Sequence, residues 1–279
     1  MIPTAVRCGT RRGLIELRQA FAGTAMIGQL LWPVVTLVSI FVFRNRPLPG
    51  NGTLGAFILP SVLGTYVAMG MLLVIQYLAV ERDDGTLLRA KIIPNGIQGY
   101  LIGKMVTVSA TVGVYLVIIS GPGLLLVHGL AVGSAGAWLT LAWVVPLGLM
   151  ATQPIGAMLG SLVSAPRAVG YVSVVVMGMI AISGIFYPVT AMPRWLQWVA
   201  QVFPVYWLGL GMRSALLPHG ALAAELGHSW RHVETAAVLG IWAVAGMVLA
   251  PAVLRRMARR ESGSALAVRR ERALQQVGR

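Results

Sequence analysis

The stretch Glu81-Arg82-Asp83-Asp84-Gly85-Thr86-Leu87-Leu88-Arg89-Ala90-Lys91 stands between two long apolar runs and decides how the rest of the chain is interpreted. Three of the eight acidic residues of the chain fall within four positions here, at Glu81, Asp83 and Asp84. Charged side chains are costly inside a bilayer, so this segment is expected to emerge into water. Its charge density favours a docking surface over a simple turn.

The composition indicates an integral membrane protein. Of the 279 residues, 57% are hydrophobic and only 11% charged, against about 25% in soluble domains. No polar segment is long enough to bury a core of its own, so we expect one membrane domain at residues 1–254 and a basic tail at 255–279. The net charge of +14 fits the excess of Lys and Arg on the cytoplasmic side of membrane proteins, and no nucleic-acid partner is expected. The lone cysteine excludes an intramolecular disulfide, and the strong preference for Arg over Lys favours a GC-rich bacterial source.

The apolar runs predict an all-α fold with six membrane spans. A spanning helix needs about 20 apolar residues. Runs of this kind place the spans at residues 25–43, 54–79, 101–127, 137–163, 168–187 and 235–254. Before them, Leu14, Leu17 and Phe21 recur at helical spacing and predict an amphipathic helix on the membrane surface. A cleaved signal peptide is the alternative, but the apolar run is too long and no cleavage site follows it.

The segment between the last two spans is ambiguous. Residues 195–212 are uncharged and long enough to count as a seventh span. However, Pro204 divides them into halves that would each rise only about 14 Å as a helix, half the hydrocarbon thickness. Trp195 and its aromatic neighbours also prefer the membrane interface. We therefore expect a re-entrant or surface-lying helical pair outside the membrane.

The distribution of basic residues predicts the orientation. With six spans and a cytoplasmic amino terminus, 17 of the 22 basic residues lie inside and 5 outside, which favours both termini in the cytoplasm. Lys104 stands at the start of the span at 101–127 and is counted with the charged loop, so no charged residue is expected deeper inside the spans. This argues against a proton- or ion-coupled carrier, which needs an ionisable group within the membrane.

Two separated motifs identify a resemblance. The first is Glu-Arg-x-x-Gly-Thr-Leu, followed by a Pro and then by Gly-Lys at the start of a span. It comprises Glu81, Arg82, Gly85, Thr86, Leu87, Pro94, Gly103 and Lys104. The second comprises Ser183-Gly184-Ile185-Phe186-Tyr187-Pro188, Met192-Pro193-Arg194-Trp195-Leu196, Pro204 and Arg213. Both motifs, in this order and at these places, resemble the permeases of ABC type-2 exporters, which share their fold with the ABCG transporters. The resemblance covers about residues 11–254.

The resemblance implies a transport subunit with no catalytic residue, cofactor or metal of its own. ATP and Mg would bind to a separate ATP-binding subunit, and a second permease copy, identical or related, would complete a dimer in the bacterial cytoplasmic membrane. Spans two and five would line the path of a drug-like, lipid or glycolipid-like substrate. The implied ATPase-coupling residues are Glu81, Arg82, Asp83, Asp84, Gly85, Thr86, Leu87, Arg89 and Lys91. The implied path residues are Tyr66, Met69, Tyr77, Ser173, Met177, Ser183 and Phe186, and the outer cap comprises Pro188, Met192, Pro193, Trp195 and Pro204.

In physical terms the segment suits the coupling role that the resemblance implies. On composition alone the favoured alternative is ordinary solvated loop charges with positive-inside lysines, and the second motif reverses that preference. Gly85 permits a sharp change of backbone direction after the second span. Residues 86–93 can then form a short helix along the membrane, with Leu87, Leu88 and Ile92 on one face. The charged side chains on the other face can pair with a cytoplasmic partner.

Competing interpretations fit less well. Asp84-Gly85-x-x-x-Arg89 approaches the metal-binding signature of phosphatidyltransferases, but its spacing differs by one and no Asp or Glu follows until Glu225. No P-loop is present, so ATP hydrolysis is not expected on this chain. His228 and His232 alone are too few for a metal site. The functional alternatives are a secondary carrier without an ATPase and a membrane-anchored assembly or sensor protein that works through its basic tail.

Overall fold

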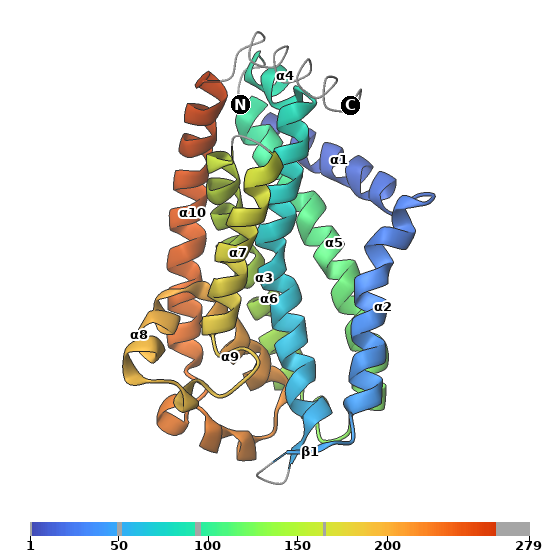
Figure 1. Ribbon diagram of the computed structural model, residues 1–279, viewed down its shortest axis with the longest axis vertical. Helices are drawn as coiled ribbons and strands as arrows, with labels where there is room; N and C mark the ends of the chain where they lie inside the picture. Colours follow the sequence, from blue (N-terminus) through green and yellow to red (C-terminus); the bar gives the residue numbers. More distant parts are fainter. Residues whose placement is uncertain (1, 49–51, 93–95, 164–165, 261–279) are drawn as a thin grey trace.

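The computed structural model describes residues 2–48, 52–92, 96–163 and 166–260, and it is almost entirely helical (Figure 1). Five of its helices are long and apolar enough to cross a membrane. These are α2 (Ala25–Phe43), α3 (Leu54–Asp83), α5 (Gly96–Leu126), α6 (Ala135–Leu162) and α10 (His232–Arg260). A shorter apolar helix, α7 (Pro166–Ile182), accompanies them. The predicted all-α membrane fold is confirmed.

Helix α3 is the centre of the bundle and packs against α5, α6, α7 and α9 (Pro204–Leu216). It begins where the Thr53 hydroxyl accepts a hydrogen bond from the Ala56 N–H, which satisfies one of the free amides of the first turn. Glycine allows its closest approach to α6, because a Cβ on Gly156 would lie 2.4 Å from the Met71 carbonyl oxygen. Gly156 therefore serves packing within the chain.

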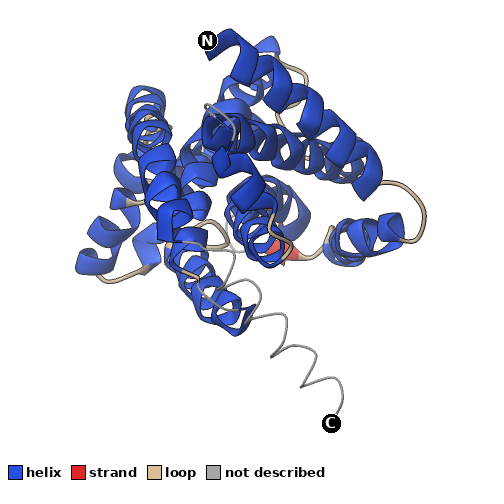
Figure 2. Cartoon of the chain, turned by 90° about the horizontal axis from the view of Figure 1, so that it is seen from above, coloured by secondary structure: helices blue, strands red, loops and turns tan. Residues whose placement is uncertain are grey.

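The two ends of the bundle carry different elements (Figure 1). One end, called the α4 end below, holds α1 (Ile2–Ala20), α4 (Thr86–Ile92) and the end of α10. Helix α1 crosses this end and is seen from its side when the molecule is viewed from above (Figure 2). The other end, called the α8 end, holds the hairpin of β1 (Pro47–Leu48) and β2 (Gly52–Thr53) and the helix α8 (Arg194–Val202). Which end faces the cytoplasm stays a prediction.

Helices α8 and α9 form the pair expected at 195–212. Phe203 is extended between them, with φ −89° and ψ 147°, because the residue before a proline is disfavoured in helix. Helix α9 is buried among α3, α6 and α10, whereas α8 exposes the indoles of Trp195 and Trp198. Three short 3-10 helices, η1 (Val189–Ala191), η2 (His219–Ala224) and η3 (Leu226–His228), complete this end.

Several helix ends differ from the predicted spans. Helix α7 stops at Ile182 instead of residue 187, because Gly184 has a φ of +67° and turns the chain away. Helix α10 continues to Arg260, so the first arginines of the predicted tail are helical. Helix α3 extends to Asp83, and α5 already begins at Gly96. Pro94 and residues 261–279 lie outside the described residues.

Candidate functional site

The predicted coupling segment is a helix–turn–helix corner at the α4 end. Helix α3 ends at Asp83, Asp84 caps it, and Gly85 turns the chain with a φ of +76°. Only glycine adopts this left-handed conformation without strain, so the sequence reasoning for Gly85 is confirmed. Helix α4 then begins at Thr86 and runs for seven residues.

Helix α4 has one face on the bundle and one in solvent. Leu87 and Ala90 are buried, whereas Arg89 and Lys91 are exposed. The prediction that Ile92 shares a face with Leu87 is wrong, since the Ile92 side chain is 82% exposed whereas Leu87 is buried. Ile92 is five positions after Leu87 and points away from it, while Ala90, three positions after, occupies the inner face. The side chains of Asp83 and Leu88 lie outside the described residues, and Asp84 is exposed.

Glu81, the first residue of the segment, points into the bundle and joins a cluster of charges around a buried lysine. The Lys104 Nζ atom on α5 lies 2.6 Å from Glu81 Oε1 and 2.7 Å from Glu16 Oε2 on α1. Arg12 Nε donates to Glu16 Oε1 at 2.8 Å, and Arg12 Nη2 is 3.7 Å from Glu81 Oε1. We call Arg12, Glu16, Glu81 and Lys104 the charge cluster; its two cations and two anions balance.

Lys104 is the centre of the charge cluster and corrects the expectation that no charged residue lies inside a span. Its side chain is 2% exposed and stands over the Tyr77 ring, 4.3 Å from the ring centroid. A lysine is buried in this way only when it is paired, and two carboxylates pair it here. Burial on its own raises the pKa of Glu16, but the hydrogen bonds from Lys104 and Arg12 outweigh it and hold that pKa below its ordinary value.

Close packing of α1 on α5 brings the charge cluster together. A Cβ on Gly9 would lie 2.7 Å from the Gly99 carbonyl oxygen, and one on Gly13 would lie 2.6 Å from the Gly103 carbonyl oxygen. The glycine pair on each helix is spaced by four residues and therefore lies on one face. This contact turns the polar side of α1 toward the bundle, whereas Leu14 is left 59% exposed.

Arg82 links the same corner to α6. Its guanidinium donates a hydrogen bond to the carbonyl of Val163, the residue that caps α6. Together, Glu81 and Arg82 connect the start of the coupling segment to α1, α5 and α6. Sequence reasoning assigned both side chains to coupling but missed Arg12, Glu16 and the pairing of Lys104. The i, i+4 spacing of Arg12 and Glu16 was the available signal.

The predicted path residues occupy different environments. On α3, Tyr66 shares a hydrogen bond with Thr36 of α2, Met69 packs against the core, and Tyr77 lies under Lys104. Of the predicted path residues on α7 and in the turn that follows it, Met177 and Phe186 are exposed and Ser183 is buried. The Ser183 hydroxyl donates to Ile180, and Ser173 donates to Val169 in the same way. Their role in transport stays a prediction.

The predicted cap residues flank the short helices at the α8 end. Pro188 precedes η1, Met192 follows it, and Pro193 precedes α8. Trp195 is exposed, whereas Pro204 is buried at the start of α9. Beneath them, Arg213 is fully buried and pairs with Glu225, with its Nε 2.6 Å from Glu225 Oε1. Arg213 also donates to the carbonyls of Gly184 and Ile185, so it fixes the turn that follows α7.

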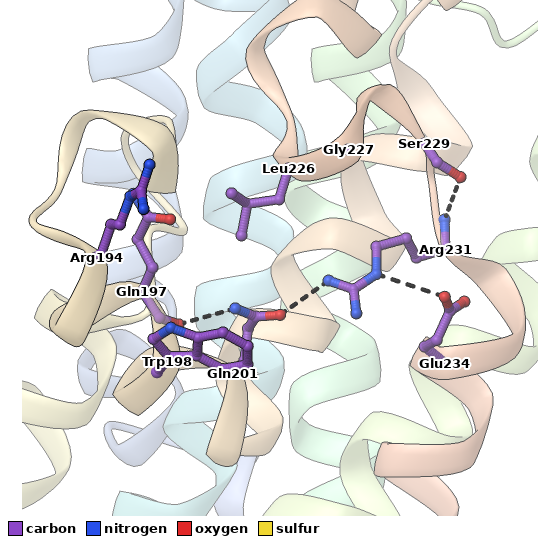
Figure 3. A pocket seen from close by; sticks show the side chains of 9 residues that line it. All are labelled: Arg194, Gln197, Trp198, Gln201, Leu226, Gly227, Ser229, Arg231 and Glu234. Atoms are coloured by element: carbon purple, nitrogen blue, oxygen red, sulfur yellow. Dashed lines mark hydrogen bonds and ion pairs between the residues drawn. The ribbon is translucent and has the colours of Figure 1, made fainter.

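A polar pocket of 580 Å³ lies between α8, η3 and the start of α10 (Figure 3). Arg231 crosses it, donates a hydrogen bond to Gln201 Oε1 at 2.9 Å and forms an ion pair with Glu234 at 3.6 Å. Trp198, 73% exposed, forms a rim of the pocket, and Arg194 stands on the same helix. The pocket therefore offers charged and amide groups beside an exposed aromatic surface. Among the described residues, no three His, Cys, Asp or Glu side chains gather as metal ligands.

Comparison with known families gives one match. Residues 38–254 match the family described as ABC-2 family transporter protein, which is well over half of the chain. The matched region contains the coupling segment and Lys104, and α1 lies before it. No curated protein matches the chain significantly.

Proposed function

The chain belongs to the ABC-2 transporter family, and on that premise we propose that it is the permease subunit of an exporter driven by a separate ATP-binding subunit. ATP and Mg bind to that subunit, and a second permease copy completes the path. The chain lies in the bacterial cytoplasmic membrane with both termini and the α4 end in the cytoplasm. The substrate is an apolar or amphipathic molecule.

The observation that carries the proposal is the connection of α4 to the spans. The exposed charges of Arg89 and Asp84 face outward, where a partner protein can reach them. The residues just before them are bonded to three other helices through Glu81 and Arg82. A displacement of α4 therefore moves α1, α3, α5 and α6 together, since a buried ion pair resists separation.

The substrate route is supported by surfaces at the other end of the molecule. Met177 and Phe186 present exposed apolar surface along α7 and its end. The pocket at the α8 end then offers polar groups beside Trp198 (Figure 3). This order, apolar first and mixed polar and aromatic at the exit, suits a molecule with an apolar body and a polar group.

The proposal is tested by measuring which energy source drives transport. Inside-out vesicles that contain the chain and its native partners are given fluorescent amphipathic dyes and short-chain fluorescent phospholipids. Uptake of a probe is expected to stop on ATP depletion and to continue with an ionophore. Glu81→Lys is expected to abolish uptake while leaving the chain inserted, because it places three cations around one carboxylate. Arg44→Glu, at the α8 end, is the control and should transport normally.

A secondary carrier is the second candidate, and the charge cluster is the observation that favours it. Lys104 and Glu81 are ionisable groups within the helical bundle, of the kind that an ion-coupled carrier uses. Uptake that an ionophore abolishes and ATP depletion spares would establish this function and overturn the proposed one.

A further inference from the structure

The last helix carries an exposed apolar stripe that leads directly to a group of arginines. Ile241, Val244 and Val248 are 68%, 64% and 67% exposed, and their spacing of three and four places them on one face of α10. The same spacing continues through Ala252 to Arg255 and Arg259, which are also exposed. We call the first three residues the α10 stripe.

The arginines border a hollow of 340 Å³ between α10, α4 and the start of α5. Its lining residues are Lys91, Gly96, Ile97, Gln98, Arg255, Ala258 and Arg259. We call it the basic hollow, because its described lining has three cationic side chains and no carboxylate. Among the described residues, neither Arg255 nor Arg259 forms an ion pair, and Arg255 Nε is held by the Pro251 carbonyl at 3.1 Å.

We propose that the basic hollow binds the phosphate of an anionic phospholipid whose acyl chain lies along the α10 stripe. Arg255 and Arg259, with Lys91 beside them, suit a phosphate, and the lack of a carboxylate among the described lining residues disfavours a headgroup that also carries an ammonium. From Arg255 to Val244 the helix descends about 16 Å, which matches one leaflet of a hydrocarbon core about 30 Å thick. The stripe favours a membrane lipid over free phosphate, since it gives the acyl chain a surface.

The bound lipid would also contact the coupling helix. Lys91 belongs to α4, whereas Arg255 and Arg259 belong to α10. A phosphate between them bridges the two helices. Anionic lipid is therefore a partner of the coupling region, independent of the substrate.

The test is a lipid titration of the purified full chain in mild detergent, read by native mass spectrometry. Wild-type chain is expected to bind dioleoyl phosphatidylglycerol in preference to dioleoyl phosphatidylcholine. The double variant Arg255→Gln/Arg259→Gln is expected to lose about 25-fold in affinity for phosphatidylglycerol, about fivefold for each arginine near the membrane surface. The matched control Arg44→Gln/Arg46→Gln, at the α8 end, should keep the wild-type affinity.

Two further arms identify the ligand. Val244→Ser/Val248→Ser should weaken phosphatidylglycerol binding, whereas inorganic phosphate at a concentration equal to the lipid should not displace it. Full displacement by inorganic phosphate, with no effect of the serine variant, would assign the hollow to free phosphate and overturn the lipid proposal. Unchanged lipid binding in Arg255→Gln/Arg259→Gln would also overturn it. Loss of an ATP-binding subunit from the same variant would assign the hollow to protein docking and would likewise overturn the lipid proposal.

Discussion

Removal of the buried lysine is the sharpest perturbation of the charge cluster. Lys104→Met keeps the length and the apolar stem of the side chain but deletes the cation that Glu16 and Glu81 share. Breaking a buried ion pair costs about 3–5 kcal/mol, because the remaining charge is left unpaired. Glu16 retains Arg12, and the Glu16 and Glu81 side chains are 21% and 14% exposed, so water can reach them. We therefore expect a loss near the lower limit, about 3 kcal/mol, which is roughly 150-fold in the folding equilibrium.

A double-mutant cycle isolates the pair itself. Glu81→Gln alone should cost about 2 kcal/mol, because it removes one charge-assisted hydrogen bond to a buried cation. The double variant Glu81→Gln/Lys104→Met should cost about 3 kcal/mol instead of the sum of about 5, since it removes both charges together. The predicted coupling free energy is therefore about 2 kcal/mol.

The free energy of unfolding is measured by titration of mixed micelles with a denaturing detergent, with the eight tryptophans as the fluorescent probe. Lys91→Met is the matched control, because Lys91 is the only other lysine and its side chain is exposed; it should cost less than about 0.5 kcal/mol. Costs that simply add in the double variant, or a Lys104→Met variant as stable as Lys91→Met, would refute the charge cluster as described.

Three further outcomes follow from the described contacts. Gly13→Leu should displace α1 from α5 and speed tryptic cleavage after Arg18, because Gly13 lies against the backbone of α5. The control Gly28→Leu has open space around it and should not change the cleavage rate, and equal cleavage of the two variants would contradict the close contact. The folded state lowers the pKa of Glu16, so the stabilisation that Glu16 provides relative to Glu16→Gln should be present at pH 7 and decline as the pH falls below about 4.3, the ordinary glutamate pKa. A stability difference that grows in acid would contradict the lowered pKa. Glu225→Ala should cost about 3 kcal/mol in unfolding free energy by leaving Arg213 buried without its carboxylate, and a cost below about 1 kcal/mol would show that water replaces it.

Local signals predicted the helices well. The first span at 25–43 coincides with α2, because an uncharged apolar run bounded by a polar turn leaves little choice for its limits. Pro204 and Gly85 were placed correctly for the same reason, since backbone restriction and freedom are properties of single residues. The end of α7 was predicted five residues too late, because Ser183 and Gly184 carry no charge and leave the uncharged run unbroken, although the helix ends just before them.

The pairings between distant residues were not predictable in this way. Lys104 was assigned to the edge of a loop, whereas it lies in the third turn of α5 and depends on Glu16, 88 positions earlier. Arg213 was counted among the five basic residues outside the membrane and placed in the second motif, but its partner was not foreseen, because the folding of the η2 segment brings Glu225 onto it. The glycine spacings at Gly9 and Gly13, repeated at Gly99 and Gly103, were a usable signal for the contact of α1 with α5.

The measurement that tests the central claim most directly is an affinity purification of the tagged chain from its native host in mild detergent, with mass spectrometry of the proteins that accompany it. The account predicts a stoichiometric ATP-binding subunit that is lost on Arg89→Glu, which reverses an exposed charge of α4, and is retained on Arg44→Glu at the other end of the bundle. Recovery of the chain without any ATP-binding subunit, in a detergent that keeps a known ABC complex intact, would contradict the account.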